Sequence, residues 1–298
     1  MSSDKEGSCC AIIAFSIWGL FPLYFKSLEH ISPLVILSCR IIWSAVLLIL
    51  LIIVLRQWRQ VLDIVKDKQQ LLLLFITTVL IGVNWGAYVW AINNDYIFEA
   101  SLAYYINPLI NVFLGYVFLT ERLRATQWFA VLLAVVGVSI EAIVYGQVPW
   151  IALMLSSVFG LYGLLHKKMQ VDSIAGLSIE AFLLMPLSLF YVIYLWQAEP
   201  LAVSSPANWS LKEWFLLAAA GPVTVIPLVL FTMAAHRISL ASLGFVQYIT
   251  PTLLFLLAAF VYQQSYSPVK LLTFVFIWCG LMIMSIDALH YHRRLRLT

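Results

Sequence analysis

Long apolar runs dominate the pattern of this chain. Ten of them are long enough to cross the hydrocarbon layer as helices, which takes about 20 residues each. The expected spans are 8–27, 33–55, 71–92, 96–120, 126–145, 149–167, 174–196, 213–235, 240–262 and 269–289. Two longer polar stretches interrupt them: 56–70 predicts a surface helix, and 197–212, which contains Pro and Ser, predicts a loop. The pattern therefore predicts an all-α membrane protein of ten transmembrane helices.

Composition supports the same class. Of the 298 residues, 63% are apolar and only 10% are charged, whereas about 25% are charged in soluble domains. The net charge of +3 gives no electrostatic footprint for nucleic acid. The sequence has no G-x-x-x-x-G-K-[ST] phosphate loop, so ATP is not expected as its energy source. No spacing of ligand residues predicts a metal site, and we expect no cofactor.

The distribution of Lys and Arg predicts the orientation in the membrane. With the N-terminus in the cytoplasm, 13 of the 17 basic residues fall on the cytoplasmic side, three fall outside, and Arg40 lies within a span. Basic residues favour the cytoplasmic side of a membrane. Both termini are therefore expected in the cytoplasm. The 13 are Lys5, Arg56, Arg59, Lys66, Lys68, Arg122, Arg124, Lys167, Lys168, Arg237, Arg293, Arg294 and Arg296, and the outer three are Lys26, Lys212 and Lys270.

A short motif occurs twice. The segment 105–108 reads YINP, and 248–251 reads YITP, 143 residues later. Each motif places a proline in the middle of an apolar run. A proline there leaves one carbonyl without its helical partner and bends the helix, which the membrane interior tolerates where a cavity or a neighbouring helix satisfies that carbonyl. We expect both bends near the bilayer centre.

Further matches extend the repeat to four spans. The segment 100–102 recurs at 241–243, and the pattern Trp18-Gly19 with Lys26 matches Phe159-Gly160 with Lys167, in both cases 141 residues later. The chain then divides into 1–146 and 147–298, with five spans in each half. Because five is odd, the second half must enter the bilayer inverted. Inverted repeats are the basis of alternating access in many transporters; a duplication without a transport role is the alternative.

Polar and aromatic residues near the paired prolines are the candidates for a solute site. Asn107 and Asn111 share a helix face, and Gln247 is the nearest polar counterpart in the second half. Hydrogen bonding between helices is the other interpretation. The aromatic residues suit either the wall of a pocket for an aromatic solute or simple packing. The candidate residues are Trp18, Asn84, Tyr104, Asn107, Pro108, Asn111, Gln247 and Pro251.

Charged residues inside the spans are candidates for gating or proton coupling, because a charge in hydrocarbon is costly and is usually paired. Their expected depths pair Arg40 with Glu99 as an outer gate. Glu180 lies near the inner side, and we expect an inner gate around Glu180 and His236. The candidate partners of Glu180 at inner helix ends are His166, Lys167, His236 and Arg237. Snorkelling and static packing are the alternative. Three further carboxylates, Glu121, Glu141 and Asp287, are expected at solvated helix ends.

Several segments resemble the RarD family. These are Trp18 to Lys26, Asn84-Trp85, Ala91 to Asn94, Glu99 to Pro108, Glu121 to Leu123 and Gly244 to Pro251. RarD proteins, named for chloramphenicol sensitivity, are EamA-type members of the drug/metabolite transporter superfamily. The resemblance implies ten helices in two inverted EamA repeats and a bacterial inner membrane. Glu121 matches the acidic residue that usually follows the fourth helix, but Gln264 replaces it in the second half.

The leading interpretation is a secondary transporter that exports small organic metabolites or drugs, with its site at the membrane midplane. Its expected partners are a small-molecule solute and the lipid bilayer, and a homodimer stays open. A channel is the first alternative, although it would not use the two conformations that inverted repeats provide. A membrane-embedded enzyme is the second. It would need converging catalytic groups, whereas the five histidines are scattered along the chain, so we expect no enzyme.

Overall fold

The computed structural model describes residues 2–294 except 95, 170, 199–204 and 264–266. The described residues contain ten helical segments long and apolar enough to cross a membrane. The all-α prediction of ten spans is confirmed. The long helices are α1 (Ser2–Phe25), α2 (Pro33–Val54), α4 (Lys68–Asn93), α5 (Ile97–Phe118), α6 (Ala125–Tyr145), α7 (Trp150–Lys168), α8 (Ser173–Ala198), α9 (Leu211–Arg237) and α12 (Pro268–Arg294); α10 (Leu240–Gln247) and α11 (Ile249–Leu256) together form the ninth span.

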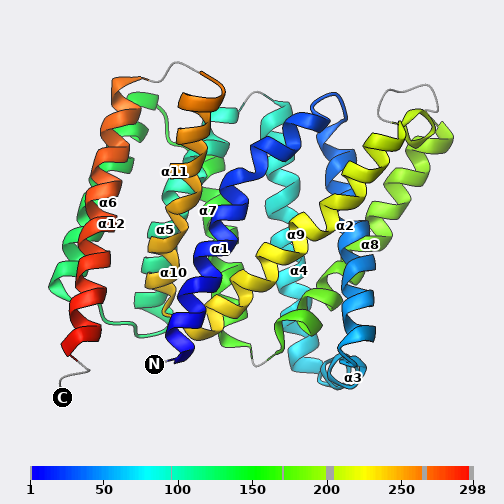
Figure 1. Ribbon diagram of the computed structural model, residues 1–298, viewed down its shortest axis with the longest axis horizontal. Coiled ribbons are helices and arrows are strands. Elements are labelled where there is room, and N and C mark those ends of the chain that lie inside the picture. Colours follow the sequence, from blue (N-terminus) through cyan, green and yellow to red (C-terminus); the bar gives the residue numbers. More distant parts are fainter. Residues whose placement is uncertain (1, 95, 170, 199–204, 264–266, 295–298) are drawn as a thin grey trace.

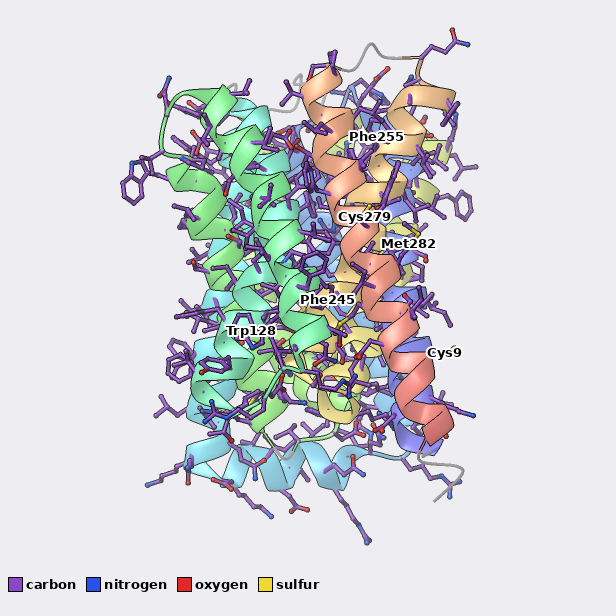
Figure 2. All side chains as sticks on the ribbon, turned by 90° about the vertical axis from the view of Figure 1, so that its left-hand side faces the viewer. Cys9, Trp128, Phe245, Phe255, Cys279 and Met282 are labelled. Atoms are coloured by element: carbon purple, nitrogen blue, oxygen red, sulfur yellow. The ribbon has the colours of Figure 1, made fainter. Side chains whose placement is uncertain are left out.

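The two polar stretches behave differently. The first contains the short helix α3 (Trp58–Lys66), as expected, after a turn in which Arg56 has a φ of 57°. Ile64 is buried in α3 and packs with Met169 and Val171, which holds the helix across one end of the bundle (Figure 2). In the second stretch α8 continues to Ala198, and the short helix η2 (Pro206–Asn208) precedes α9.

The two proline motifs do not have the same backbone. Helix α5 continues through Pro108, whereas the ninth span divides at Tyr248, between α10 and α11. A π-helical segment, η3 (Leu257–Val261), follows α11. Pro251 has no N–H to donate to the carbonyl of Gln247 four residues earlier. The expected irregularity is thus a break in the second half only.

The helices form a bundle whose ends are easily distinguished (Figure 1). At one edge α6 packs against α12, and at the other α2 packs against α8; between them α5 contacts α7 and α10, and α1 contacts α9, α10 and α11. Helix α1 begins, and α12 ends, at the lower end in Figure 1. We call this end the terminus side. The short helix η1 (Lys26–Leu28) and the start of α2 lie on the opposite side.

The α2–α9 crossing brings two backbones into close contact. A Cβ atom placed on Gly221 would lie 2.6 Å from the carbonyl oxygen of Trp43 and 2.7 Å from its carbonyl carbon. Only glycine fits there without a shift of the backbone. Thr224, one turn further along α9, is thereby brought beside Arg40, one turn earlier on α2.

We expect Gly221→Ala to lower the melting temperature of the purified protein, because the added methyl group meets main-chain atoms rather than a flexible side chain. Overpacking of this kind costs about 1–3 kcal/mol. Gly86→Ala is the matched control, since nothing lies within 4 Å of a Cβ at Gly86. Thermal unfolding in detergent measures both variants, and an unchanged midpoint for Gly221→Ala would contradict the tight crossing.

Candidate functional site

A cavity of about 460 Å³ lies between the helices of the two halves. Its walls come from α1, α2, α4, α5, α7, α9, α10 and α11. Glu29, an exposed residue of the connection between η1 and α2, also lines it, so the cavity extends to the opposite side of the bundle. Pockets that bind small molecules typically measure about 300–1,000 Å³. The size therefore suits a small organic solute.

Five of the eight candidate solute-site residues line this cavity, namely Trp18, Asn84, Tyr104, Asn107 and Gln247. The other three, Asn111, Pro108 and Pro251, lie behind its wall. Asn111 is buried, and its amide donates a hydrogen bond of 2.9 Å to Gln247 Oε1. Pro108 lies where α5 meets α10, because a Cβ on Gly244 would be 2.7 Å from the Pro108 carbonyl oxygen. The hydrogen-bonding interpretation therefore applies to Asn111, and the cavity interpretation to Asn107.

The polar groups of the cavity wall differ in how they are satisfied. The amide of Asn84 donates to the carbonyl oxygen of Leu155 at 2.8 Å. Asn107 is only 7% exposed, and its Oδ1 atom has no hydrogen-bond partner among the described residues. A buried polar atom without a partner costs free energy, and this oxygen lies beneath the surface of the cavity wall.

Arg40 and Glu99 do not pair in this structure. Arg40 lines the cavity and donates from Nε to Thr224 Oγ1 at 3.0 Å. Glu99 accepts a hydrogen bond of 2.8 Å from the backbone amide of Ile151, in the first turn of α7. A carboxylate at a helix N-terminus is stabilised by the exposed amides and the helix dipole. The Arg40–Glu99 pair is thus not formed in this conformation, in which each partner has another contact, and the outer gate stays a prediction.

Five aromatic rings close the cavity toward the terminus side. Neighbouring rings have centroid separations of 5.3–6.3 Å, within the usual range for aromatic contacts. We call this group the aromatic plug. Its members are Phe15, Trp18, Phe159, Tyr162 and Phe231. Phe15, Tyr162 and Phe231 are fully buried, so these rings fill the space beside the cavity.

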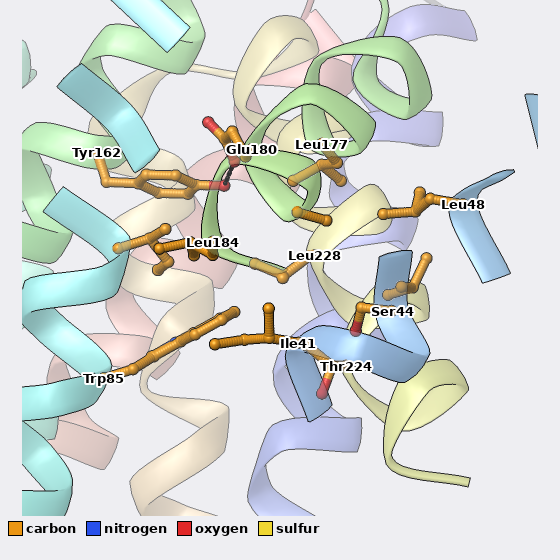
Figure 3. Close-up of a pocket in the computed structure, with 13 residues that line it drawn as sticks. Ile41, Ser44, Leu48, Trp85, Tyr162, Leu177, Glu180, Leu184, Thr224 and Leu228 are labelled. Atoms are coloured by element: carbon orange, nitrogen blue, oxygen red, sulfur yellow. Dashed lines mark hydrogen bonds between the residues drawn. The ribbon is translucent and has the colours of Figure 1, made fainter. Parts of the chain in front are cut away.

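Glu180 forms a buried cluster beside the plug. Its carboxylate accepts hydrogen bonds from Thr77 and from the hydroxyl of Tyr162 at 3.1 Å, and His166 Nε2 lies 2.9 Å from Oε1. The cluster joins α4, α7 and α8. Figure 3 shows Glu180 and Tyr162 at the edge of a small pocket of about 30 Å³, which shares Trp85, Thr224 and Leu228 with the main cavity.

His236 joins the same cluster through the backbone. Its Nε2 atom lies 2.7 Å from the carbonyl oxygen of His166. The structure thus brings Glu180, His166 and His236 together near the terminus side, as the sequence suggested. It also adds Thr77 and Tyr162, which sequence reasoning missed because an isolated Thr or Tyr in an apolar run carries no pattern.

Two charged side chains satisfy the connection between α9 and α10. Lys167 Nζ donates to the carbonyl oxygens of Ala235, at 3.0 Å, and Ile238. Glu121 accepts from the backbone amides of Leu240, at 2.7 Å, and Ala241, at 3.0 Å. We call these contacts the terminus-side closure. Glu121 is therefore not a solvated helix end.

The other two carboxylates that were expected at solvated helix ends, Asp287 and Glu141, are also largely shielded from solvent. Asp287 pairs with Arg124 and accepts from Thr126 Oγ1 at 2.6 Å, which joins α12 to the start of α6. Glu141 is 6% exposed. The expectation of solvated ends is wrong for all three carboxylates. Gln264 lies outside the described residues, so the comparison of Glu121 with its counterpart stays a sequence observation.

The comparisons with known proteins agree with this architecture. Residues 5–141 match the model of the EamA-like transporter family. The chain is 47% identical to a Vibrio cholerae protein named as an uncharacterised transporter, with 98% of this chain and 97% of that protein covered. It is 41% identical to Protein RarD of Escherichia coli, with 97% of each chain covered. A solved crystal structure superposes with a TM-score of 0.72 at 17% identity, covering 98% and 99% of the two chains, which shows the shared fold.

Relatives that are this similar over nearly the whole chain, together with ten membrane spans, determine the family. The chain belongs to the RarD family of EamA-like transporters and is a multi-pass membrane protein.

Proposed function

We propose that this protein is a secondary transporter that exports small organic metabolites or drugs by alternating access. One observation carries the proposal: the cavity extends to one side of the bundle and is closed on the other by the aromatic plug and the terminus-side closure. A site accessible from one side at a time is what distinguishes a transporter from a channel. The conformation corresponds to the state open on the opposite side.

Helix packing supports the division into repeats 1–146 and 147–298. In the repeat, α1 corresponds to α7, α2 to α8, α4 to α9, α5 to α10 with α11, and α6 to α12. Replacing each helix of a contact by its counterpart gives the equivalent contact of the other half. The α1–α9 contact corresponds to α7–α4, α2–α9 to α8–α4, and α1–α11 to α7–α5, and all of these are present. The α2–α8, α5–α10 and α6–α12 contacts convert into themselves. Two states related by this exchange would be of similar energy, as alternating access requires.

Close contacts at the α6–α12 crossing also occur in equivalent pairs. At the α6–α12 crossing, a Cβ on Gly137 would lie 3.0 Å from the carbonyl oxygen of Thr273, and a Cβ on Gly280 would lie 2.9 Å from that of Ala130. Gly280 follows Gly137, and Thr273 follows Ala130, by 143 residues, so the repeat converts one contact into the other. In the two proline motifs, the hydroxyl of Tyr248 donates to the carbonyl of Tyr105 at 3.2 Å. These contacts make the α6–α12 and α5–α10 crossings candidates for the axis of exchange.

We assign the residues to roles on this basis. Trp18, Asn84, Tyr104, Asn107 and Gln247 contact the solute, and Glu180 and His236 belong to the gate on the terminus side. The excess of basic residues near that side favours an orientation with both termini in the cytoplasm, and the similarity to bacterial RarD proteins favours the bacterial inner membrane. The closure then faces the cytoplasm, and the cavity faces outward.

Flux through reconstituted vesicles tests the proposed function. Metabolite profiling of cells with and without the protein identifies a solute, and proteoliposomes loaded with unlabelled solute should then accumulate labelled solute faster than empty ones. Such counterflow requires a site that alternates between the two sides. Flux that is linear in concentration and insensitive to loading would indicate a channel, and recovery of a chemically altered solute would indicate an enzyme.

Removal of the lysine contacts should open the terminus side. Lys167→Met eliminates the donor to the carbonyls of Ala235 and Ile238, so we expect Leu228→Cys, in the cavity wall, to react faster with a membrane-impermeant thiol reagent applied from the terminus side. The background must lack the four native cysteines. Labelling rates in inside-out vesicles measure the effect.

Lys168→Met is the matched control for this experiment, because Lys168 neighbours Lys167 but lies over the ring of Phe118 instead. Its labelling rate should equal that of the parent. Equal labelling rates in the parent, Lys167→Met and Lys168→Met would show that Lys167 does not stabilise the terminus-side closure.

The break in the ninth span should matter for transport more than for insertion. Pro251→Ala restores an amide that can bond to the Gln247 carbonyl, so it favours a continuous helix and alters the cavity wall at Gln247. We expect a reduced rate of counterflow with normal amounts of protein in the membrane. Pro149→Ala, at the N-cap of α7 and outside any helix interior, is the control. Wild-type counterflow in Pro251→Ala would refute a role for the break.

A further inference from the structure

Arg40 is a cation at the wall of the cavity. It lies deep within the protein, yet its side chain keeps accessible surface because it lines the cavity. The guanidinium carbon lies 5.0 Å from the ring centre of Trp85, 5.7 Å from that of Phe25 and 5.9 Å from that of Phe21. Rings at such distances attract a cation through their negative faces. The rings and Thr224 together hold the guanidinium in place.

No carboxylate of the described residues neutralises this charge. The ion pairs of that part of the chain are His30 with Glu213, Arg124 with Asp287, His166 with Glu180, and Arg237 with Glu6. Glu29 lines the mouth of the cavity but forms no ion pair with Arg40. A guanidinium carries five N–H groups, and Thr224 accepts from one of them. The other donors are open to a partner from the cavity.

We propose that Arg40 binds the carboxylate of the transported solute, and that the solute class is small aromatic carboxylic acids. This inference rests on the proposed function. An unpaired cation in a membrane span is costly, and an anionic solute would remove that cost when it binds. Arg binds planar carboxylates with two parallel hydrogen bonds.

The rest of the wall fits the same class of solute. Trp18, Tyr88 and Phe159 supply aromatic surface on which a flat ring can pack. Asn107 and Gln247 add polar amide groups to the wall, which suit a hydroxyl or amino group on the solute. Of the described residues lining the cavity, Arg40 is the one with a permanent positive charge, which matches a monoanion better than a phosphate dianion.

Matched probes test the inference directly. 4-Hydroxyphenylacetate and its uncharged amide differ only in the carboxylate, and 4-hydroxyphenyl phosphate replaces it with a dianion. Binding to the purified full-length protein in nanodiscs is followed by the fluorescence of the cavity tryptophans and by melting temperature. We expect the acid to bind more tightly than the amide and the phosphate. In Arg40→Gln, the affinity for the acid should fall about tenfold or more, because a charged hydrogen-bond partner is lost.

Arg122→Gln is the control, since Arg122 packs over the ring of Tyr116 and lies outside the cavity wall. It should bind the acid as the parent does. If Arg40→Gln does not fold, Arg40→Lys replaces it: the charge remains but the paired hydrogen bonds do not, so the acid should bind more weakly. Equal binding of acid and amide, tighter binding of the phosphate, unchanged affinity in the folded Arg40 variant, or no binding of the acid overturns the inference.

Counterflow separates this inference from the proposed function. If the acid binds in an Arg40-dependent way but no solute shows counterflow, the inference that Arg40 binds the carboxylate stands and the transport proposal fails. If a neutral solute shows saturable counterflow that persists in Arg40→Gln, the transport proposal stands and the inference about the carboxylate fails.

Discussion

Satisfaction of backbone polar groups within the membrane is the constraint on which this structure depends. Hydrocarbon offers no hydrogen bonds, so each helix end or break near the bilayer needs a partner from the protein. The α9–α10 connection meets that need with side chains from distant helices. Lys167 of α7 binds its carbonyls, and Glu121, which follows α5, binds its amides. The charges match the helix dipoles, with the cation at the end of α9 and the anion at the start of α10.

These contacts also make the closure reversible. They are hydrogen bonds between elements, not within a helix, so they can break without unfolding any helix. Each bond contributes only about 0.5–1.5 kcal/mol net, or about 1.5–3 when one partner is charged. A closure built from a few such bonds and an aromatic plug has a free energy comparable to what binding of a solute can supply. That balance is what a transporter needs between two conformations.

The sequence predicted the number of spans, α3, and five residues of the cavity lining, because each of these leaves a periodic or compositional signal. Asn107 and Gln247 were recognisable since a polar group in hydrocarbon is rare. The Arg40–Glu99 pair stays a prediction: it is not formed in this conformation, and depth arithmetic gives a residue's level but not its direction around the helix. The role of Glu121 was missed for a related reason: its partners are backbone amides, which every residue has, so no pattern in the sequence identifies them.

Lys26 and Lys167 occupy equivalent positions in the two halves but have different contacts. Lys167 binds the end of α9, whereas Lys26, 141 residues earlier, lies 4.4 Å from the ring centre of Tyr262. Under the proposed exchange of halves, equivalent residues occupy different environments in any one conformation. The lysine on the closed side is bound to a helix end, and the lysine on the open side is not. The opposite arrangement would close the cavity mouth near Glu29 and leave Arg40 and its solute accessible from the terminus side.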